Sequence, residues 1–202
     1  MRNPLSLNHL QNDRRRLLAA IAASPLLLGA LWSCSSASAK SPSVFAAARR
    51  GKQPVLCGLN ANSELCWELP VPRRAHDVAL HPSKPQLAFM ARRPGQQIWW
   101  LSRESGELLG ECKAPANTQF NGHAAYSPDG SSLFTTETVF PGNVGQIGIY
   151  DSASFERIGS FLSGGVDPHQ LLLLPGSDVL VVANGGKVES SPFLPSPPIS
   201  SS

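Results

Sequence analysis

The sequence predicts an all-β protein built from the four-stranded blades of a β-propeller of the YVTN or WD40 type. Three observations favour this fold. A unit recurs at a nearly constant interval, apolar and polar residues alternate in short runs, and the 202 residues include 17 glycines and 18 prolines. Short alternating runs bounded by turn residues are typical of strands, and a period of about 40–50 residues is the length of one blade.

The repeated unit consists of a histidine, an apolar strand, a proline-centred turn and a second apolar strand. The histidines are His76, His123 and His169, and the turn prolines are Pro82, Pro128 and Pro175, which lie 46 and 47 residues apart. A third and a fourth strand follow within residues 97–110 and 146–160. A β-sandwich is the alternative, but the nearly equal spacing favours an incomplete propeller of about three to four blades over residues 44–186.

Residues 1–39 have the order of an export signal. Arg14, Arg15 and Arg16 directly precede an apolar run, which resembles a twin-arginine signal, and the Ala-Ser-Ala of residues 37–39 fits a cleavage site. Residues 31–34 also resemble a lipobox that would place a lipid on Cys34. We therefore expect a periplasmic protein, either soluble or a lipoprotein, that meets the membrane only through its leader or a lipid anchor.

Charge and composition limit the expected partners and indicate where the folded part of the chain ends. The net charge of +3 comes from residues 1–39, because basic and acidic residues are equal in number beyond them. No basic stripe is interleaved with aromatic residues, so nucleic acid is not an expected partner. Residues 187–202 are rich in proline and serine and are expected to be disordered. Because propellers typically close with about four to eight blades, we expect a chain truncated or frameshifted near residue 190.

Two cysteines are candidates for a disulfide in an oxidising compartment. Residues 55–59 and 64–69 read as two strands around a turn-rich tetrapeptide. If Leu59 pairs with Glu64, Cys57 lies opposite Cys66, within reach of a disulfide bond. The alternative is a pair of half-buried thiols. No two cysteines have the spacing of a zinc knuckle or a thioredoxin motif.

The repeat histidines are the main candidate site. His76, His123 and His169 occupy one phase of three blades, so they are expected at the mouth of the central channel, where imidazoles can bind a transition metal. The alternative is that each histidine fixes blade packing by a hydrogen bond. Glu137, expected at the start of a long loop over residues 138–145, is the candidate ligand-binding acid. A pair of arginines at residues 92–93 reads as an anion site or a solvated turn, and His81 is expected to be exposed.

Several segments resemble the DUF1513 family of exported bacterial proteins. They are residues 120–137, which include a Tyr-Ser-Pro-Asp-Gly turn, and residues 145–151, 167–175 and 181–186. The resemblance covers about residues 44–186 and implies a propeller, with no assigned activity. Genes for this family often lie beside those of imelysin-type proteins linked to iron uptake, which implies periplasmic metal-uptake proteins as partners.

Function is predicted only broadly. The chain contains no Gly-x-Ser-x-Gly, His-Glu-x-x-His or phosphate-binding glycine loop. The leading hypothesis is a non-enzymatic periplasmic binding or scaffold protein, linked through the family resemblance to iron or other metal uptake, with a transition metal as the candidate cofactor. The alternatives are an enzyme with its site at the channel mouth and a truncated product without activity.

Overall fold

The computed structural model describes residues 41–188, in which thirteen strands form four antiparallel sheets. The expected export signal, Cys34 and most of the expected C-terminal tail lie outside these residues. The first blade contains β1 (Val44–Arg50), β2 (Gln53–Leu59) and β3 (Leu65–Pro70), and the second contains β4 (Ala75–Leu80), β5 (Gln86–Ala91), β6 (Gln97–Ser102) and β7 (Leu108–Lys113). The third contains β8 (Thr118–Tyr126), β9 (Ser132–Val139), β10 (Val144–Asp151) and β11 (Arg157–Leu162), and the fourth contains β12 (Pro168–Leu173) and β13 (Leu180–Asn184).

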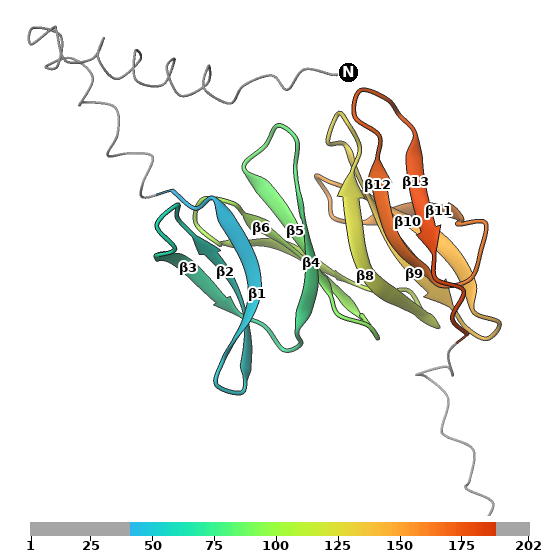
Figure 1. Ribbon diagram of the computed structural model, residues 1–202, viewed down its shortest axis with the longest axis horizontal. Coiled ribbons are helices and arrows are strands. Elements are labelled where there is room, and N and C mark those ends of the chain that lie inside the picture. The colour runs from blue at the N-terminus through green and yellow to red at the C-terminus, as the bar shows by residue number, and fades with distance from the viewer. Residues whose placement is uncertain (1–40, 189–202) are drawn as a thin grey trace, which may run out of the picture. The chain divides into compact units, whose positions relative to one another are not determined.

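The four sheets follow one another like the blades of a fan (Figure 1). The first strands of the second, third and fourth blades, β4, β8 and β12, pack side by side and form the inner edge of the fan. The predicted all-β fold made of four-stranded propeller blades is thereby confirmed. Within residues 41–188, no helix is long and apolar enough to cross a membrane.

Strand β1 corresponds to the second strand of a complete blade. It ends in Ala48-Arg49-Arg50, and the matching second strand β5 ends at Ala91 and is followed by two arginines, at residues 92–93. The next strands, β2 and β6, both begin with a glutamine. The described part of the first blade therefore contains the second, third and fourth strands of the repeat, and its arginine pair lies at the same end of the fan as the pair that follows β5.

Alternate residues of the middle strands enter two different cores. In β5, Phe89 packs toward the first blade and Met90 toward the third, and in β6 the same division separates Trp99 from Trp100. All four side chains are almost fully buried. Because successive side chains of a strand point to opposite faces, a sheet covered on both faces needs a continuous apolar sequence. This explains the unbroken Ile-Trp-Trp-Leu of residues 98–101.

Trp67 of the first blade packs against the second blade. The Trp67 indole donates a hydrogen bond to the Arg103 carbonyl oxygen at 3.1 Å. A Cβ atom added at Gly58 or Gly106 would lie 2.4–2.5 Å from this ring. Gly106 also has a φ of +71°, a conformation that other residues rarely adopt. These two glycines leave the space that the indole fills between the blades.

The predicted opposition of Cys57 and Cys66 was wrong. Leu59 pairs with Leu65 where Glu64 was expected, and the bulge between Gly58 and Leu59 skips Cys66, so that Cys57 pairs with Glu68. Cys66 is the extra residue of this bulge and therefore does not lie opposite Cys57. Cys57 is buried and Cys66 exposed, and no disulfide joins them.

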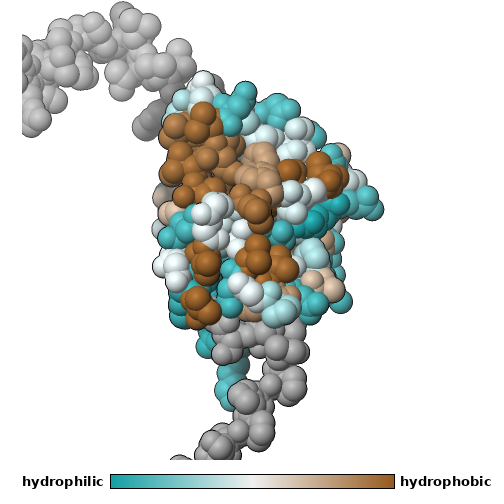
Figure 2. Space-filling model, turned by 90° about the vertical axis from the view of Figure 1, so that its right-hand side faces the viewer, coloured by the Kyte–Doolittle hydropathy of each residue, from teal (hydrophilic) through white to brown (hydrophobic). Residues whose placement is uncertain are grey.

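The fourth blade exposes an apolar face. Figure 2 looks at the side of the molecule where β11 to β13 lie and shows hydrophobic residues gathered over several patches. The exposed large apolar residues of β11, the outer strand of the third blade, are Ile158, Phe161 and Leu162, and those of the fourth blade are Leu172, Leu174, Val179 and Val181. In the preceding blades the corresponding sheet faces are covered by the next blade.

Candidate functional site

Each repeat histidine lies at a β-bulge of an inner strand, where His76 and His169 are second residues of their strands and His123 lies in the middle of β8. The register of β4 against β5 shifts between Ala75 and Asp77, which leaves His76 without a partner across the ladder. The register of β12 shifts in the same way around His169, and that of β8 shifts across residues 121–123, which include His123. Bulges redirect side chains and are over-represented beside functional sites. The three bulges occur at one position of the repeat.

The bulges bring the three imidazoles into a row. The ring centroids of His76 and His123 lie 4.9 Å apart, and those of His123 and His169 lie 5.2 Å apart, both pairs with tilted or edge-to-face rings. We call this end of the propeller the histidine rim. The prediction that the histidines gather at one end of the inner strands agrees with this geometry. His76 and His169 are exposed, and His123 is half-buried between them.

Asp77 orients the central histidine. Its Oδ2 atom lies 3.0 Å from the Nδ1 atom of His123, across the boundary between the second and third blades. The Nε2 atom of His123 is buried and has no hydrogen-bond partner within the part of the chain that the structure describes. An imidazole held by a carboxylate on one nitrogen has a fixed ring orientation. Sequence reasoning missed this role of Asp77, because only the spatial pairing of two blades reveals it.

Backbone geometry lets the rings approach. Gly122 has a φ of +106°, and a Cβ atom there would lie 2.8 Å from a carbon of the His76 ring. Asn121 is buried and donates a hydrogen bond to the Pro168 carbonyl oxygen at 2.9 Å, which ties the third blade to the fourth. These contacts hold the bulge of β8 against its neighbours on both sides.

The surroundings of His76 favour its neutral form. Partial burial lowers the pKa of His76 below its ordinary value of 6.5, and the neighbouring His123 and Arg92 lower it further, against the opposing effect of Asp77. Desolvation and nearby positive charge both disfavour a charged imidazole. His76 is therefore mainly a neutral hydrogen-bonding group near pH 7.

A preformed metal centre is not present at the histidine rim. Among residues 41–188, no group of three or more histidine, cysteine, aspartate or glutamate side chains is placed to hold a metal ion. The physical reason is that the rings of His76, His123 and His169 contact one another by edges and faces. A metal site needs ring nitrogens that point at one common position, at about 2.0–2.1 Å for zinc.

Glu137 does not line a ligand site, contrary to expectation. It lies within β9, which continues to Val139, and its side chain is fully buried. Its carboxylate accepts four hydrogen bonds at 2.8–3.0 Å, and the donors are Thr135, Gln146, Tyr150 and Arg157. Every acceptor position is thereby used by the protein itself. Glu137 is a structural carboxylate inside the third blade.

The arginine pair of residues 92–93 lies on the histidine rim. The backbone N–H of Arg92 donates a hydrogen bond to the Arg74 carbonyl oxygen at 2.8 Å. Arg93 forms an ion pair with Asp167, which lies just before β12 and has a φ of +59°. This ion pair joins the loop after β5 of the second blade to the entry of the fourth blade.

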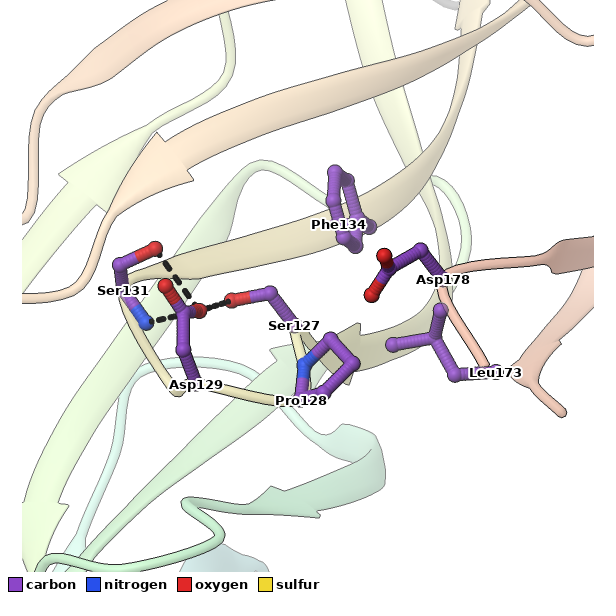
Figure 3. A pocket seen from close by; sticks show the side chains of 7 residues that line it. All are labelled: Ser127, Pro128, Asp129, Ser131, Phe134, Leu173 and Asp178. Atoms are coloured by element: carbon purple, nitrogen blue, oxygen red, sulfur yellow. Dashed lines mark hydrogen bonds between the residues drawn. The ribbon is translucent and has the colours of Figure 1, made fainter. Parts of the chain in front are cut away.

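The opposite end of the inner strands carries the proline turns and a pocket of about 370 Å³. Figure 3 shows the pocket, whose wall includes Pro128, Asp129 and Asp178. Hydrogen bonds from Ser127 and Ser131 lower the pKa of Asp129 to about 2. Because Asp129 holds its own turn through these bonds, its carboxylate serves the structure of the turn.

His81 belongs to this opposite end and is buried, with 3% of its surface exposed, where exposure was expected. Its Nδ1 atom accepts hydrogen bonds from the backbone N–H groups of Ser83 and Lys84 at 3.2 and 3.0 Å. Burial and the nearby charge of Lys84 lower the pKa of His81. The imidazole is an acceptor that closes the turn after β4, a role that the repeat pattern did not indicate.

Comparison with solved structures supports the fold. The hydrazine synthase of Kuenenia stuttgartiensis is similar with a TM-score of 0.55 and 16% identity, covering 73% of this chain and 44% of that chain. Dihydro-heme d1 dehydrogenase NirN in complex with DHE has a TM-score of 0.46 and 13% identity, covering 58% and 27%. The chain spans less than half the length of each of these two proteins.

Comparison with protein families gives a match over most of the described strands. A search of curated proteins found no match. Residues 69–193 match the model described as "Protein of unknown function (DUF1513)". This segment includes all three histidines of the rim, their bulged strands and the turn prolines. Because it makes up more than half of the chain, the protein belongs to the DUF1513 family.

Proposed function

We propose that the protein is an exported, non-catalytic binding protein of the periplasm whose ligand docks on the histidine rim. The observation that carries this proposal is the bulge at each of His76, His123 and His169. A bulge interrupts the ladder, so three bulges at one repeat position indicate a requirement other than sheet pairing. The sequence pattern of residues 1–39 supports export, and the family resemblance supports a link to metal-uptake proteins as partners.

The geometry of His123 favours binding over acid–base catalysis. A general base must reach its substrate proton with a free nitrogen atom. The Nδ1 atom of His123 faces Asp77, and its Nε2 atom is buried between neighbouring side chains. His123 therefore acts as a positioning residue, and the exposed His76 and His169 are the groups that a ligand reaches first.

Histidine resonances provide the test. The imidazole signals of the full-length protein, assigned through His76→Gln and His169→Gln, are followed during separate titrations with Zn²⁺ and inorganic phosphate. We expect at least one probe to shift the signals of His76 and His169 while His81, at the opposite end, stays unchanged. If neither probe moves them, or if His81 moves equally, the histidine rim is not a ligand site.

The same titration decides the metal hypothesis. Binding of Zn²⁺ at a defined stoichiometry, lost in both histidine variants, would require the rings to rotate so that their nitrogens converge. It would support a role of the histidine rim in metal uptake. Binding of zinc that persists in both variants would place the metal elsewhere in the chain.

A further inference from the structure

Three pairs of neighbouring arginines lie around the histidine rim. Their positions are the end of β1 at residues 49–50, the connection from β3 to β4 at residues 73–74, and the loop after β5 at residues 92–93. The backbone bond from Arg92 to Arg74 joins the last two pairs. A bond from the Val71 N–H to the Pro54 carbonyl oxygen, at 3.0 Å, holds the connection against the start of β2, beside the first pair.

Three acids near this end are already engaged. Glu68 pairs with Arg50 at 2.8 Å, Asp167 pairs with Arg93, and Asp77 pairs with His123 at 3.0 Å. Four exposed arginines have no carboxylate within 4.0 Å among residues 41–188, namely Arg49, Arg73, Arg74 and Arg92. Their positive charge is compensated by no ion pair in that part of the chain.

The opposite end carries the reverse charge. The acids in or beside its turns are Glu64, Glu104, Glu107, Asp129, Asp151, Glu156 and Asp178, and its basic residues are Lys84, Arg103 and Arg157. The chain beyond the leader is neutral in sum, so the charge is separated between the two ends. Separated charge attracts an anion toward the positive end and raises its local concentration there.

We infer that the histidine rim binds a small oxyanion, a phosphate or carboxylate group, held by Arg92 and His76 with Arg74 beside them. This inference rests on the proposed function and names its ligand class. Arg92 lies beside the start of β4, because Ala91 pairs with Ala75 and the Arg92 N–H donates a hydrogen bond to the Arg74 carbonyl oxygen, two residues before His76. A guanidinium offers paired donors that match the oxygens of a phosphate or carboxylate, and an imidazole adds one N–H donor.

The binding depends on pH in a stated direction. The groups that act on His76 are His123 of β8, His169 of β12, Asp77 of β4 and Arg92 after β5. The bound anion adds a negative charge, which favours the protonated imidazole and raises the pKa of His76. Linkage then requires that protonation of His76 strengthens anion binding as the pH falls, a contribution that is measured as the difference between the wild-type protein and His76→Gln at each pH.

Calorimetry of the full-length protein with inorganic phosphate and with citrate, at constant ionic strength, tests the inference. We expect saturable binding of at least one anion, weakened about tenfold or more in Arg92→Gln, because a hydrogen bond to a charged group is lost. The matched control, Lys84→Gln, removes one positive charge from the opposite end and leaves the affinity unchanged. His76→Gln removes the part of the pH dependence that comes from the imidazole and leaves the part that comes from ionisation of the anion itself. The stronger of the two arms identifies a phosphate or a carboxylate as the preferred group.

Other outcomes overturn the inference. Absence of saturable binding for both anions rules it out, and equal weakening in Arg92→Gln and Lys84→Gln reduces it to unspecific attraction. If Zn²⁺ shifts the signals of His76 and His169 while both anions fail, the proposed function stands and only the ligand class is wrong. Circular dichroism of each variant confirms that it retains the β-sheet fold.

Discussion

Replacing Glu137 by glutamine is expected to destabilise the protein strongly, although the two side chains have nearly the same shape. The Oε1 atom of Glu137 accepts hydrogen bonds from Thr135 and Tyr150, and Oε2 accepts from Gln146 and Arg157, all at 2.8–3.0 Å. An amide provides one acceptor atom and one donor group. In either orientation, two of the four bonds lose an acceptor, and the Arg157 guanidinium loses its counter-charge.

The magnitude follows from the burial of the carboxylate, which has 0% of its surface exposed. Leaving a buried polar group unsatisfied costs about 1–3 kcal/mol, and breaking a buried ion pair costs about 3–5 kcal/mol. Because the amide keeps some bonds and Arg157 is partly exposed, we expect a loss of about 3 kcal/mol in the free energy of unfolding. For a domain of this size, the melting temperature falls by about 6–12 °C.

Urea denaturation followed by tryptophan fluorescence measures the change. Glu107→Gln is the matched control, because Glu107 is exposed in a turn and its replacement is expected to change stability by less than about 0.5 kcal/mol. If Glu137→Gln loses less than about 1 kcal/mol, the network does not stabilise the third blade as described. Ligand affinity is measured separately from the free energy of unfolding, so ligand binding by the variant has no bearing on this result.

Three further predictions follow from the fold. Iodoacetamide at pH 8 is expected to modify the exposed Cys66 much faster than Cys112. The reason is that burial, and then the charge of Glu137, raise the pKa of Cys112 to about 12. Peptide mass spectrometry measures both rates. Acid is expected to lower stability, because the folded state binds a proton at His81 more weakly than the unfolded chain does. The loss of stability begins near pH 6.5 as the pH falls. Denaturation curves of His81→Gln should therefore show a weaker dependence on pH. Gly106→Ala is expected to lower the free energy of unfolding by about 2 kcal/mol or more. Gly164→Ala, which has a positive φ but no atom within 4 Å of the added carbon, should lower it by about 1 kcal/mol. Equal losses would contradict the packing of the Trp67 indole between the blades.

The blade architecture could be predicted because proline turns and apolar alternation are local signals. Pro82, Pro128 and Pro175 fix the turn between the first two strands of each unit, and their spacing directly gives the length of the blade. The apolar run of residues 98–101 likewise indicates a strand that is covered on both faces. Patterns of this kind depend on residues that are close in sequence, so they can be recognised without knowledge of tertiary contacts.

The details of the site depend on contacts that no local pattern carries. The bulge at Gly58 and Leu59 decides which face Cys66 occupies, and bulges have no reliable sequence signature. The sequence predicts that Glu137 begins a loop, because it follows two threonines and precedes a glycine-containing segment, whereas Arg157 and Tyr150 make its burial in β9 favourable. The row of histidines could be expected from their common phase, but their edge-to-face contacts could not.

The ion pair between Arg93 and Asp167 connects the second blade to the fourth and skips the third. In a protein built from stacked repeats, stability is roughly a sum of terms for each repeat and for each adjacent interface, so an end repeat can open by itself. A bond between next-nearest repeats adds cooperativity to such a stack, because local opening of the fourth blade must break a contact that starts two blades away. A substitution in the loop after β5 should therefore change the rate of amide hydrogen exchange in β12, although these two segments belong to blades that are not adjacent.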